Sequence, residues 1–209
     1  MATVTLYGTP ISTYVRTVRL LLAEANMDHD LVDIGIFNGD NKTDDYLKKH
    51  PFGKVPAVEI DGTQIYETSA ITHYLNGLAE GKFAPSDLLT QSRMHQIAAI
   101  IDSYLYGPAI GSIVIQRLIV PQQGGDTDEQ AVQQAIAPVK KALEAIESLC
   151  VSNPFLLGNA ITLADFYLVP IFVYLSKTKE FDAVTAQTPK LRVWWEQIKL
   201  RDAVKQVCG

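Results

Sequence analysis

The chain has 209 residues, of which 47% are hydrophobic and 20% are charged, and its formal net charge at pH 7 is −5. This composition is that of an ordinary globular protein with enough apolar residues for a sizeable core. The mild negative charge gives no electrostatic reason to expect nucleic acid or an anionic membrane as a partner.

The sequence also bears on the cellular compartment. The N-terminus has no basic segment followed by an apolar run, so we expect no signal peptide. The longest apolar runs are too short to span a membrane. Cys150 and Cys208 lie far apart and match no metal-ligand spacing, which favours two free thiols over a metal site. These features predict a cytoplasmic protein without a metal and without a membrane partner.

The first eighty residues alternate between strand and helix signals. The order predicts β-α-β-α-β-β-α, a small mixed sheet with helices on both faces. The helical crossovers imply parallel pairing first, and Asp61-Gly62 predicts a hairpin that adds an antiparallel edge. Short β-rich runs occupy residues 3–8, 29–34, 55–60 and 63–67, and helical patterns occupy 13–26, 44–50 and 68–78. In the last helix one apolar stripe is expected from Ala70, Ile71, Tyr74, Leu75 and Leu78.

The rest of the chain shows no comparable strand signal. A first helical pattern covers residues 87–118. A second begins at a cap formed by Asp126 or Thr127 and runs to about residue 149. A third covers residues 189–201, in which Trp194 and Trp195 are expected to be core residues. Between the last two helical segments, Thr162 and Asp165 have the spacing of a capping box. We therefore predict an α/β domain over 1–78, a linker over 79–86 and an all-helical domain over 87–209.

Two adjacent hydroxyls, Ser12 and Thr13, lie at the turn from the first strand to the first helix. A helix N-cap needs one hydroxyl. If Thr13 is the cap, Ser12 is left to face the carboxyl end of the sheet, where clefts of open α/β sheets lie. The alternative is that either hydroxyl caps the helix and the other is solvated.

Two further features lie at strand ends. Val55-Pro56 begins a strand, and from the residues alone a trans bond is the ordinary expectation. Glu67 and Thr68 lie where the helix after the fourth strand begins. Backbone N–H groups at a helix start bind anions, whereas Glu67 suits either the helix dipole or a bound ammonium.

Three stretches together resemble a known family. They are LYGTPIST with Arg16 four residues after Ser12, DDYLKKHPFGKVPAVEIDGTQIYETSAITHYL, and NPFLLGNAITLADFYLVP, which begins at Asn153. In this order they resemble the cytosolic glutathione S-transferases, and most closely the serine-type, phi-like and theta-like enzymes with their bacterial relatives. The resemblance spans nearly the whole chain and implies a thioredoxin-like first domain that binds glutathione.

The resemblance implies a role for each candidate site residue. Ser12 would donate to the glutathione thiolate and lower the thiol pKa, with Tyr7 and then Thr13 as the alternatives. It also implies a cis Val55-Pro56 bond. Three positions depart from the phi-like pattern, namely Asn41, Lys54 and Thr68. The implied glutathione-binding residues are Asn41, Lys42, Lys54, Val55, Pro56, Glu67 and Thr68.

The same resemblance implies a second, apolar substrate and a partner subunit. Phe52 falls where an aromatic inserts into the other subunit of a homodimer. The expected reaction is conjugation of glutathione to a small electrophile in detoxification. The alternatives are peroxidase, isomerase or thiol-transfer chemistry on the same fold, or a non-catalytic scaffold. The candidate electrophile contacts, expected between the domains, are Ile11, Phe37, Tyr104, Tyr106 and Ile110.

Overall fold

The computed structural model describes residues 3–151 and 154–209. A turn is predicted at Asn153-Pro154 and Gly158, and of these Asn153 lies outside the described residues. Phe155 and Gly158 form an antiparallel bridge, so the chain does turn here. The chain forms two compact units. The first extends to Lys82 and includes Lys205–Gly209, and the second is Phe83–Val204. The last five residues of the chain thus group with the first unit. The domain bounds given above, 1–78, 79–86 and 87–209, stay a prediction.

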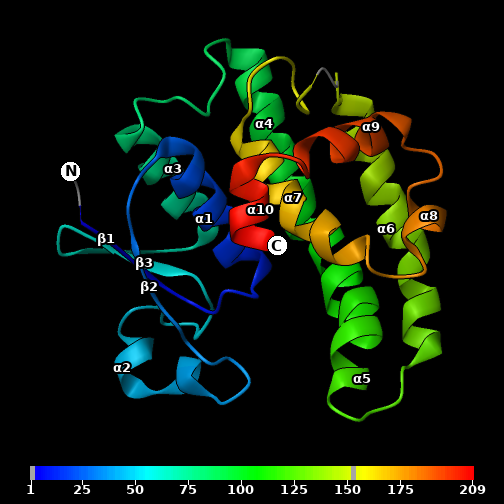
Figure 1. Ribbon diagram of the computed structural model, residues 1–209, viewed down its shortest axis with the longest axis horizontal. Helices are drawn as coiled ribbons and strands as arrows, with labels where there is room; N and C mark the ends of the chain where they lie inside the picture. The colour runs from blue at the N-terminus through cyan, green and yellow to red at the C-terminus, as the bar shows by residue number, and fades with distance from the viewer. Residues whose placement is uncertain (1–2, 152–153) are drawn as a thin grey trace. The chain divides into compact units, whose positions relative to one another are not determined.

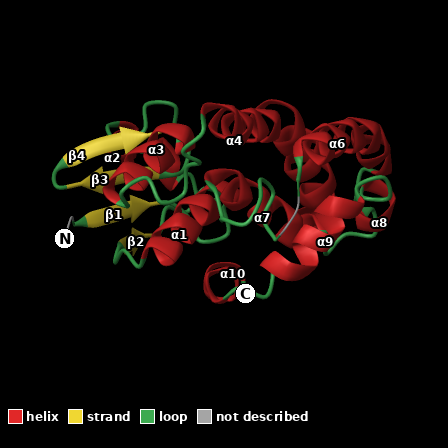
Figure 2. Ribbon diagram, turned by 90° about the horizontal axis from the view of Figure 1, so that it is seen from above, coloured by secondary structure: helices red, strands yellow, loops and turns green. Residues whose placement is uncertain are grey.

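The first unit contains the sheet. Its strand order is β2-β1-β3-β4, and Figure 2 shows the four arrows in that order. Strand β1 pairs in parallel with β2 and antiparallel with β3, and β4 pairs antiparallel with β3. The element order is as predicted. The second connection holds only two short helices and brings β3 back antiparallel to β1, so only one parallel pair forms. The elements are β1 (Val4–Tyr7), α1 (Thr13–Ala25), β2 (Asp30–Val32), η1 (Asp40–Lys42), α2 (Asp44–Leu47), β3 (Ala57–Ile60), β4 (Thr63–Tyr66) and α3 (Thr68–Leu78).

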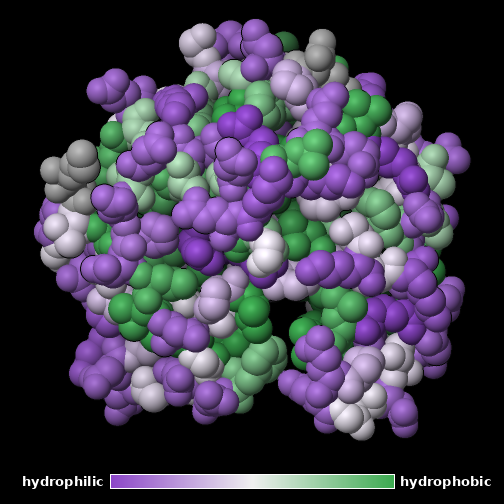
Figure 3. Space-filling model, in the orientation of Figure 1, coloured by the Kyte–Doolittle hydropathy of each residue, from purple (hydrophilic) through white to green (hydrophobic). Residues whose placement is uncertain are grey.

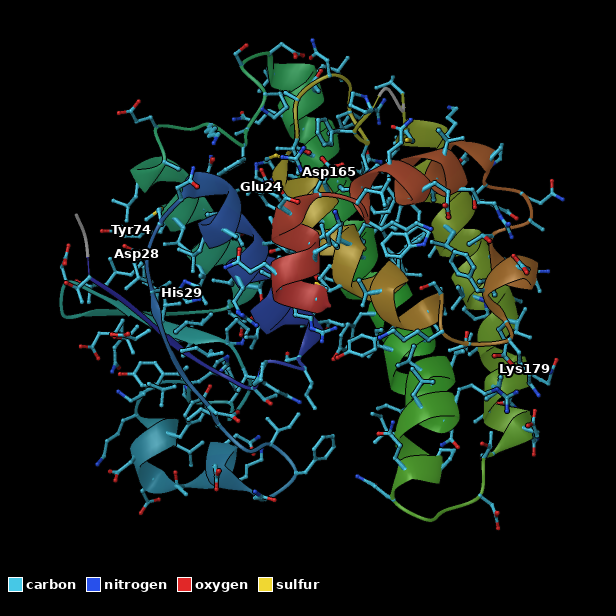
Figure 4. The ribbon with its side chains drawn as sticks, in the orientation of Figure 1. Glu24, Asp28, His29, Tyr74, Asp165 and Lys179 are labelled. Carbon is cyan, nitrogen blue, oxygen red and sulfur yellow. The ribbon has the colours of Figure 1, made fainter. Side chains whose placement is uncertain are left out.

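Helices α1 and α3 cover one face of the sheet and α2 lies on the other (Figure 1). Val4 and Leu6 on one side of β1 are 2% and 0% exposed, so this side of the strand lies in the core. In α3 only part of the predicted stripe is buried. Ile71 and Leu75 are fully covered, whereas Tyr74 and Leu78 are each 42% exposed. Tyr74 lies on the outer side of the helix (Figure 4), so the sheet covers a narrower face than the pattern predicted.

The second unit is helical. The segment predicted as one helix over residues 87–118 changes to π-helix after Ile100. The N–H of Tyr106 bonds to the carbonyl of Ile101, and that of Val120 to Ile115, which is the i→i+5 pattern. Pro108 has no N–H and its ring crowds the preceding turn, which favours the wider π turn. The elements are α4 (Leu88–Ile100), η2 (Ile101–Leu105), η3 (Gly107–Ile119), α5 (Val120–Gln122), α6 (Glu129–Leu149), α7 (Leu163–Leu175), α8 (Phe181–Val184) and α9 (Pro189–Ile198), and α10 (Asp202–Cys208) ends the chain.

Two helix starts in this unit were predicted with different success. Asp128 caps α6 by accepting from the N–H of Ala131 at 3.0 Å, so the prediction of Asp126 or Thr127 was wrong by one or two residues. The capping box of α7 is confirmed. Asp165 is completely buried, and its Oδ2 accepts the N–H and hydroxyl of Thr162 at 2.8 and 2.9 Å.

Asp165, which is labelled in Figure 4, also links distant parts of the helical unit through hydrogen bonds. Its Oδ1 accepts the N–H of Leu156 at 3.0 Å and the indole N–H of Trp194 at 2.8 Å. Burial raises the pKa of the Asp165 carboxyl, and these hydrogen bonds act in the opposite direction. Trp194 and Trp195 are 0% and 7% exposed, which confirms that both are core residues.

Apolar side chains that are not buried occur in scattered places. The face in Figure 3 is largely hydrophilic, with smaller apolar areas between the polar groups. Within the described residues no single helix is long and apolar enough to cross a membrane. The helix pair Leu88–Leu105 and Gly107–Gln122, which bends by 51°, meets the length and composition requirement only when taken together.

Candidate functional site

The turn between β1 and α1 places Ser12, not Thr13, at the helix N-cap. Ser12 has extended dihedrals and its Oγ accepts the N–H of Val15 at 3.5 Å, while Thr13 is already the first helical residue. The prediction that Thr13 caps the helix is therefore wrong. The Thr13 hydroxyl is buried and makes no hydrogen bond to any described residue. Because the Ser12 oxygen accepts the cap bond, its own hydrogen remains available for donation to a ligand.

The turn before Ser12 is held in a defined shape. Gly8 has φ +159°, and a Cβ there would collide with Val15 on α1, so only glycine allows this close approach. The N–H of Ser12 donates to the carbonyl of Thr9 at 3.0 Å, and Nε of Arg16 donates to the carbonyl of Pro10 at 3.0 Å. The turn that carries Ser12 is thus held by one backbone bond and by one bond from the Arg16 side chain.

Tyr7, the alternative partner for a sulfur, is engaged elsewhere. Its hydroxyl donates to Glu59 on β3 over 3.5 Å, and Nζ of Lys49 lies 4.2 Å from its ring centre. Lys49 is also 3.8 Å from the Glu59 carboxylate. These contacts form a polar cluster of Tyr7, Glu59 and Lys49.

The loop before β3 contains a cis Val55-Pro56 peptide bond, which confirms the prediction from the resemblance over the ordinary trans expectation. Its conformation is supported from α2, because the hydroxyl of Tyr46 donates to the carbonyl of Lys54 at 2.6 Å. Burial raises the pKa of Tyr46 well above its usual value, so the hydroxyl stays protonated as a donor.

Asn41 also supports this loop. Its Nδ2 donates to the carbonyl of Gly53 at 2.7 Å, and its Oδ1 is buried without a hydrogen bond to any described residue. The resemblance implies that Asn41 lies near the glycyl carboxylate of glutathione, but its side-chain donor is used on the backbone here. Lys42 and Lys54, in contrast, are exposed to solvent.

Glu67 has an unusual backbone conformation at the start of α3. Its φ is 69° and its ψ is 122°, in a region that non-glycine residues rarely adopt and that typically costs about 1–3 kcal/mol. Its side chain makes no cap bond and is 60% exposed. Thr68, the first residue of the helix, is 9% exposed. The Glu67 side chain is thus not used to cap α3, and the first N–H groups of α3 remain available to an anion.

The candidate electrophile residues differ in exposure. In the first unit, Ile11 is 44% and Phe37 is 63% exposed. In the second unit, Tyr104 on η2 is 67% exposed, Tyr106 is half-buried and Ile110 on η3 is 8% exposed. Ile110 is thus mainly a packing residue, whereas Phe37 and Tyr104 present large apolar surfaces.

Phe52 is 67% exposed, in the turn after His50. Its ring makes edge contacts with those of His50 and Tyr66, at centroid distances of 6.2 and 6.4 Å. An exposed aromatic side chain supported from below in this way can enter a partner's pocket.

The sequence analysis did not identify Tyr46 or His50 as site residues. His50 is 2% exposed, and its Nε2 lies 4.0 Å from Oε1 of Glu67. No local pattern predicts either contact, because each depends on how α2 packs beside the loop and β4. Within residues 3–151 and 154–209, no group of three or more His, Cys, Asp or Glu side chains could hold a metal ion.

Comparison with family models gives two matches along the chain. Residues 6–83 match the model "Glutathione S-transferase, N-terminal domain", and residues 97–202 match "Glutathione S-transferase, C-terminal domain". Among curated proteins, glutathione S-transferase F13 of Arabidopsis thaliana is 31% identical over 97% of this chain and 93% of its own length.

Solved structures agree with these matches. Glutathione transferase F7 from Populus trichocarpa has a TM-score of 0.85 and 32% identity, covering 98% of this chain and 97% of that one. Glutathione S-transferase I from maize, solved with an atrazine glutathione conjugate, has a TM-score of 0.84 and 26% identity, covering 99% and 96%.

Proposed function

The chain belongs to the glutathione S-transferase family, and on that premise we propose that it conjugates glutathione to a small apolar electrophile, with Ser12 as the residue that stabilises the thiolate. The observation that carries the assignment is the position of Ser12 at the N-cap of α1, with its hydroxyl hydrogen available. The cluster that engages the Tyr7 hydroxyl supports Ser12 over Tyr7.

The chemistry of Ser12 follows from its place. A serine hydroxyl is too weak an acid to be ionised at neutral pH, so it cannot take the proton of the thiol as a base. Its role is therefore to donate a hydrogen bond to an anionic sulfur. The N-terminus of α1 adds the positive end of the helix dipole at the same place. Both effects favour the charged form of a nearby thiol. Bound glutathione supplies the thiol, which at its free pKa of about 8.5 is only slightly ionised at neutral pH.

The residues around the site suit the rest of the tripeptide. The proposed role of Glu67, whose strained backbone leaves its carboxylate exposed, is to bind the γ-glutamyl ammonium. Thr68 and the first N–H groups of α3 suit the carboxylate beside that ammonium. The backbone of Val55, before cis Pro56, is proposed to pair with the cysteinyl unit as an added strand.

The glycyl carboxylate is assigned to the exposed lysines, Lys42 and Lys54, because each can offer a positive charge. Asn41 keeps a different role in the proposal. Since its amide holds the carbonyl of Gly53, it shapes the loop that carries Lys54.

The proposal also covers the second substrate and the partner. Ile11, Phe37, Tyr104, Tyr106 and Ile110 are its electrophile contacts, and Phe37 and Tyr104 offer the largest exposed apolar surfaces among them. Phe52 is the proposed contact to a second copy of this chain in a homodimer. A cytoplasmic location and a role in detoxification belong to the same proposal.

The test is a pH titration of the ultraviolet thiolate absorbance of bound glutathione. In the wild type, we expect the bound thiol to ionise well below its free pKa. Ser12→Ala should bind glutathione but lose this shift, whereas the matched control Thr13→Val should keep it, because the Thr13 hydroxyl contacts no described polar group.

Each other outcome has a definite meaning. Binding without any shift in the wild type would refute the transferase mechanism and favour a scaffold. A shift that survives in Ser12→Ala would return the role to Tyr7 or Thr13. If the shift is present but no electrophile is conjugated, the peroxidase, isomerase or thiol-transfer alternatives lead.

A further inference from the structure

His50 is held rigidly between α2 and the loop that carries the cis bond. Its N–H donates to the carbonyl of Tyr46 at 2.9 Å, and its own carbonyl accepts the N–H of Gly53 at 2.8 Å. The imidazole ring lies 5.1 Å from the ring of Tyr66 and is 2% exposed. The backbone bonds and the covering rings together fix the direction in which the imidazole points.

The polar contacts of this imidazole are unequal. Its Nδ1 is buried and has no hydrogen-bond partner among the described residues. Its Nε2 is directed at Glu67, with 4.0 Å between Nε2 and Oε1. Burying a polar ring with one nitrogen unsatisfied costs stability, and an apolar side chain would avoid that cost. The contact between Nε2 and Glu67 is thus the interaction that a histidine provides at this position and an apolar side chain would not.

Glu67 is a side chain that benefits from being restrained. It is 60% exposed, it makes no cap bond, and its backbone is already in a strained conformation. A long, exposed carboxylate loses rotational freedom when it binds a ligand, and that loss weakens binding. A fixed donor behind the carboxylate reduces this loss. The present separation of 4.0 Å between Nε2 and Oε1 has to shorten by about 1 Å for a hydrogen bond to form.

We propose that His50 is a positioning residue, which restrains the Glu67 carboxylate for the γ-glutamyl ammonium of glutathione. This inference rests on the proposed function of the site and adds a second residue to ammonium recognition. His50 acts through Glu67 and does not itself contact the ligand.

The charge of His50 matters for the same reason. Burial lowers the pKa of His50, the positive charge of Lys54 also lowers it, and the carboxylate of Glu67 opposes both. Near pH 7 the imidazole is therefore neutral, and the charge of Glu67 is available to an ammonium. At lower pH the imidazolium would neutralise Glu67, so binding of an ammonium should weaken.

The experiment compares three proteins and two ligands by calorimetry. His50→Leu keeps the packing and removes the donor, whereas His50→Gln keeps an uncharged donor near the place of Nε2. The ligands are glutathione and an analogue that lacks the γ-glutamyl amino group. At pH 7.5 we expect His50→Leu to bind glutathione about fivefold more weakly than the wild type and to bind the analogue with unchanged affinity. The affinity of His50→Gln for glutathione should be close to that of the wild type.

Two further readouts separate positioning from a structural role. His50→Leu should raise the KM for glutathione and leave kcat at saturation unchanged. As the pH falls from 7.5 toward the lowered pKa of His50, the wild type should lose affinity more steeply than His50→Gln, which has no imidazole to protonate. If His50→Leu does not fold, the comparison of these two pH profiles still decides the question.

The inference is overturned if His50→Leu weakens both ligands equally or neither, if His50→Gln is as weak as His50→Leu, or if the two pH profiles coincide. When the wild type binds glutathione better than the analogue and the His50 variants do not differ, this inference fails and the proposed function stands. When the wild type does not bind glutathione at all, both fail.

Discussion

Replacing Arg117 by methionine removes one partner of a buried ion pair at the end of the π-helical segment η3. Arg117 donates to Oε1 of Glu180 through Nε at 2.9 Å and through Nη2 at 2.6 Å. Its Nη1 and Nη2 donate to Glu129 on α6 at 2.5 and 2.7 Å. Lys179, labelled in Figure 4, lies 3.7 Å from the same Glu129 carboxylate. The guanidinium therefore joins η3 to α6 and to the residue that precedes α8.

The expected cost follows from the exposure of each partner. The side chains of Arg117 and Glu180 are 10% and 5% exposed, and Oε2 of Glu180 already has no hydrogen-bond partner among the described residues. Without Arg117 the Glu180 carboxylate would be a buried charge with no counter-charge, which typically costs 3–5 kcal/mol. Because Glu129 on the other side is 58% exposed and admits water, we expect about 3 kcal/mol for Arg117→Met.

Urea denaturation followed by tryptophan fluorescence measures this loss. The chain has two tryptophans, Trp194 and Trp195, and both lie in the second unit, so the signal reports on that unit. The controls are Glu129→Gln, which breaks only the exposed half of the interaction, and the double variant Arg117→Met/Glu180→Met. The double variant should be more stable than Arg117→Met alone, because an apolar pair replaces the lone charge.

The reasoning is refuted if Arg117→Met destabilises no more than Glu129→Gln does. It is also refuted if the double variant is less stable than the single one. The first result would mean that water reaches Glu180 freely, and the second that packing rather than charge sets the cost.

Three further outcomes are expected. Thr13→Val should raise the free energy of unfolding by up to about 1 kcal/mol, because it removes a buried hydroxyl that has no partner among the described residues. Chemical denaturation measures this change, and a clearly lower free energy of unfolding would contradict the prediction. Asp165→Asn should lower the free energy of unfolding by about 2–3 kcal/mol, because the new amide group would face the N–H donors of Leu156 and Thr162. Denaturation followed by tryptophan fluorescence measures this, and a decrease below about 0.5 kcal/mol would show that the hydrogen bonds of Asp165 are dispensable. His29, labelled in Figure 4, has its pKa lowered by burial and by Arg19, so its contribution to stability should be present above pH 6.5 and decline as the pH falls toward its lowered pKa. Circular dichroism at several pH values should show this decline in the wild type and a flatter profile in His29→Gln, and equal profiles would argue against it.

Local sequence signals determined the order of the elements and several of their ends. The alternation of apolar residues and the Asp61-Gly62 turn predicted the four strands, and β3 and β4 do form a hairpin across that turn. Thr162 and Asp165 predicted a helix start that the structure confirms. These signals succeed because hairpin turns and capping boxes involve residues within a few positions of one another, and their physics is complete in a short segment.

The choice between neighbouring candidates was made only by the tertiary structure. Ser12 rather than Thr13 caps α1. Asp128, which was not one of the predicted residues, caps α6 in place of Asp126 or Thr127, because packing sets the residue at which helical dihedrals begin. The change from α-helix to π-helix after Ile100 was likewise not predicted, because the apolar spacing over residues 87–118 was matched only to an α-helical period.

Contacts between distant residues were also beyond the sequence. His50 meets Glu67 across 17 positions, and Arg117 meets Glu180 across 63. Such pairs depend on how loops and helices pack, and no local pattern in the chain encodes that distance. The chain therefore reveals by itself where a site's backbone turns lie, whereas the groups that orient and restrain the site's side chains are decided by folding, because each is supplied by a different element.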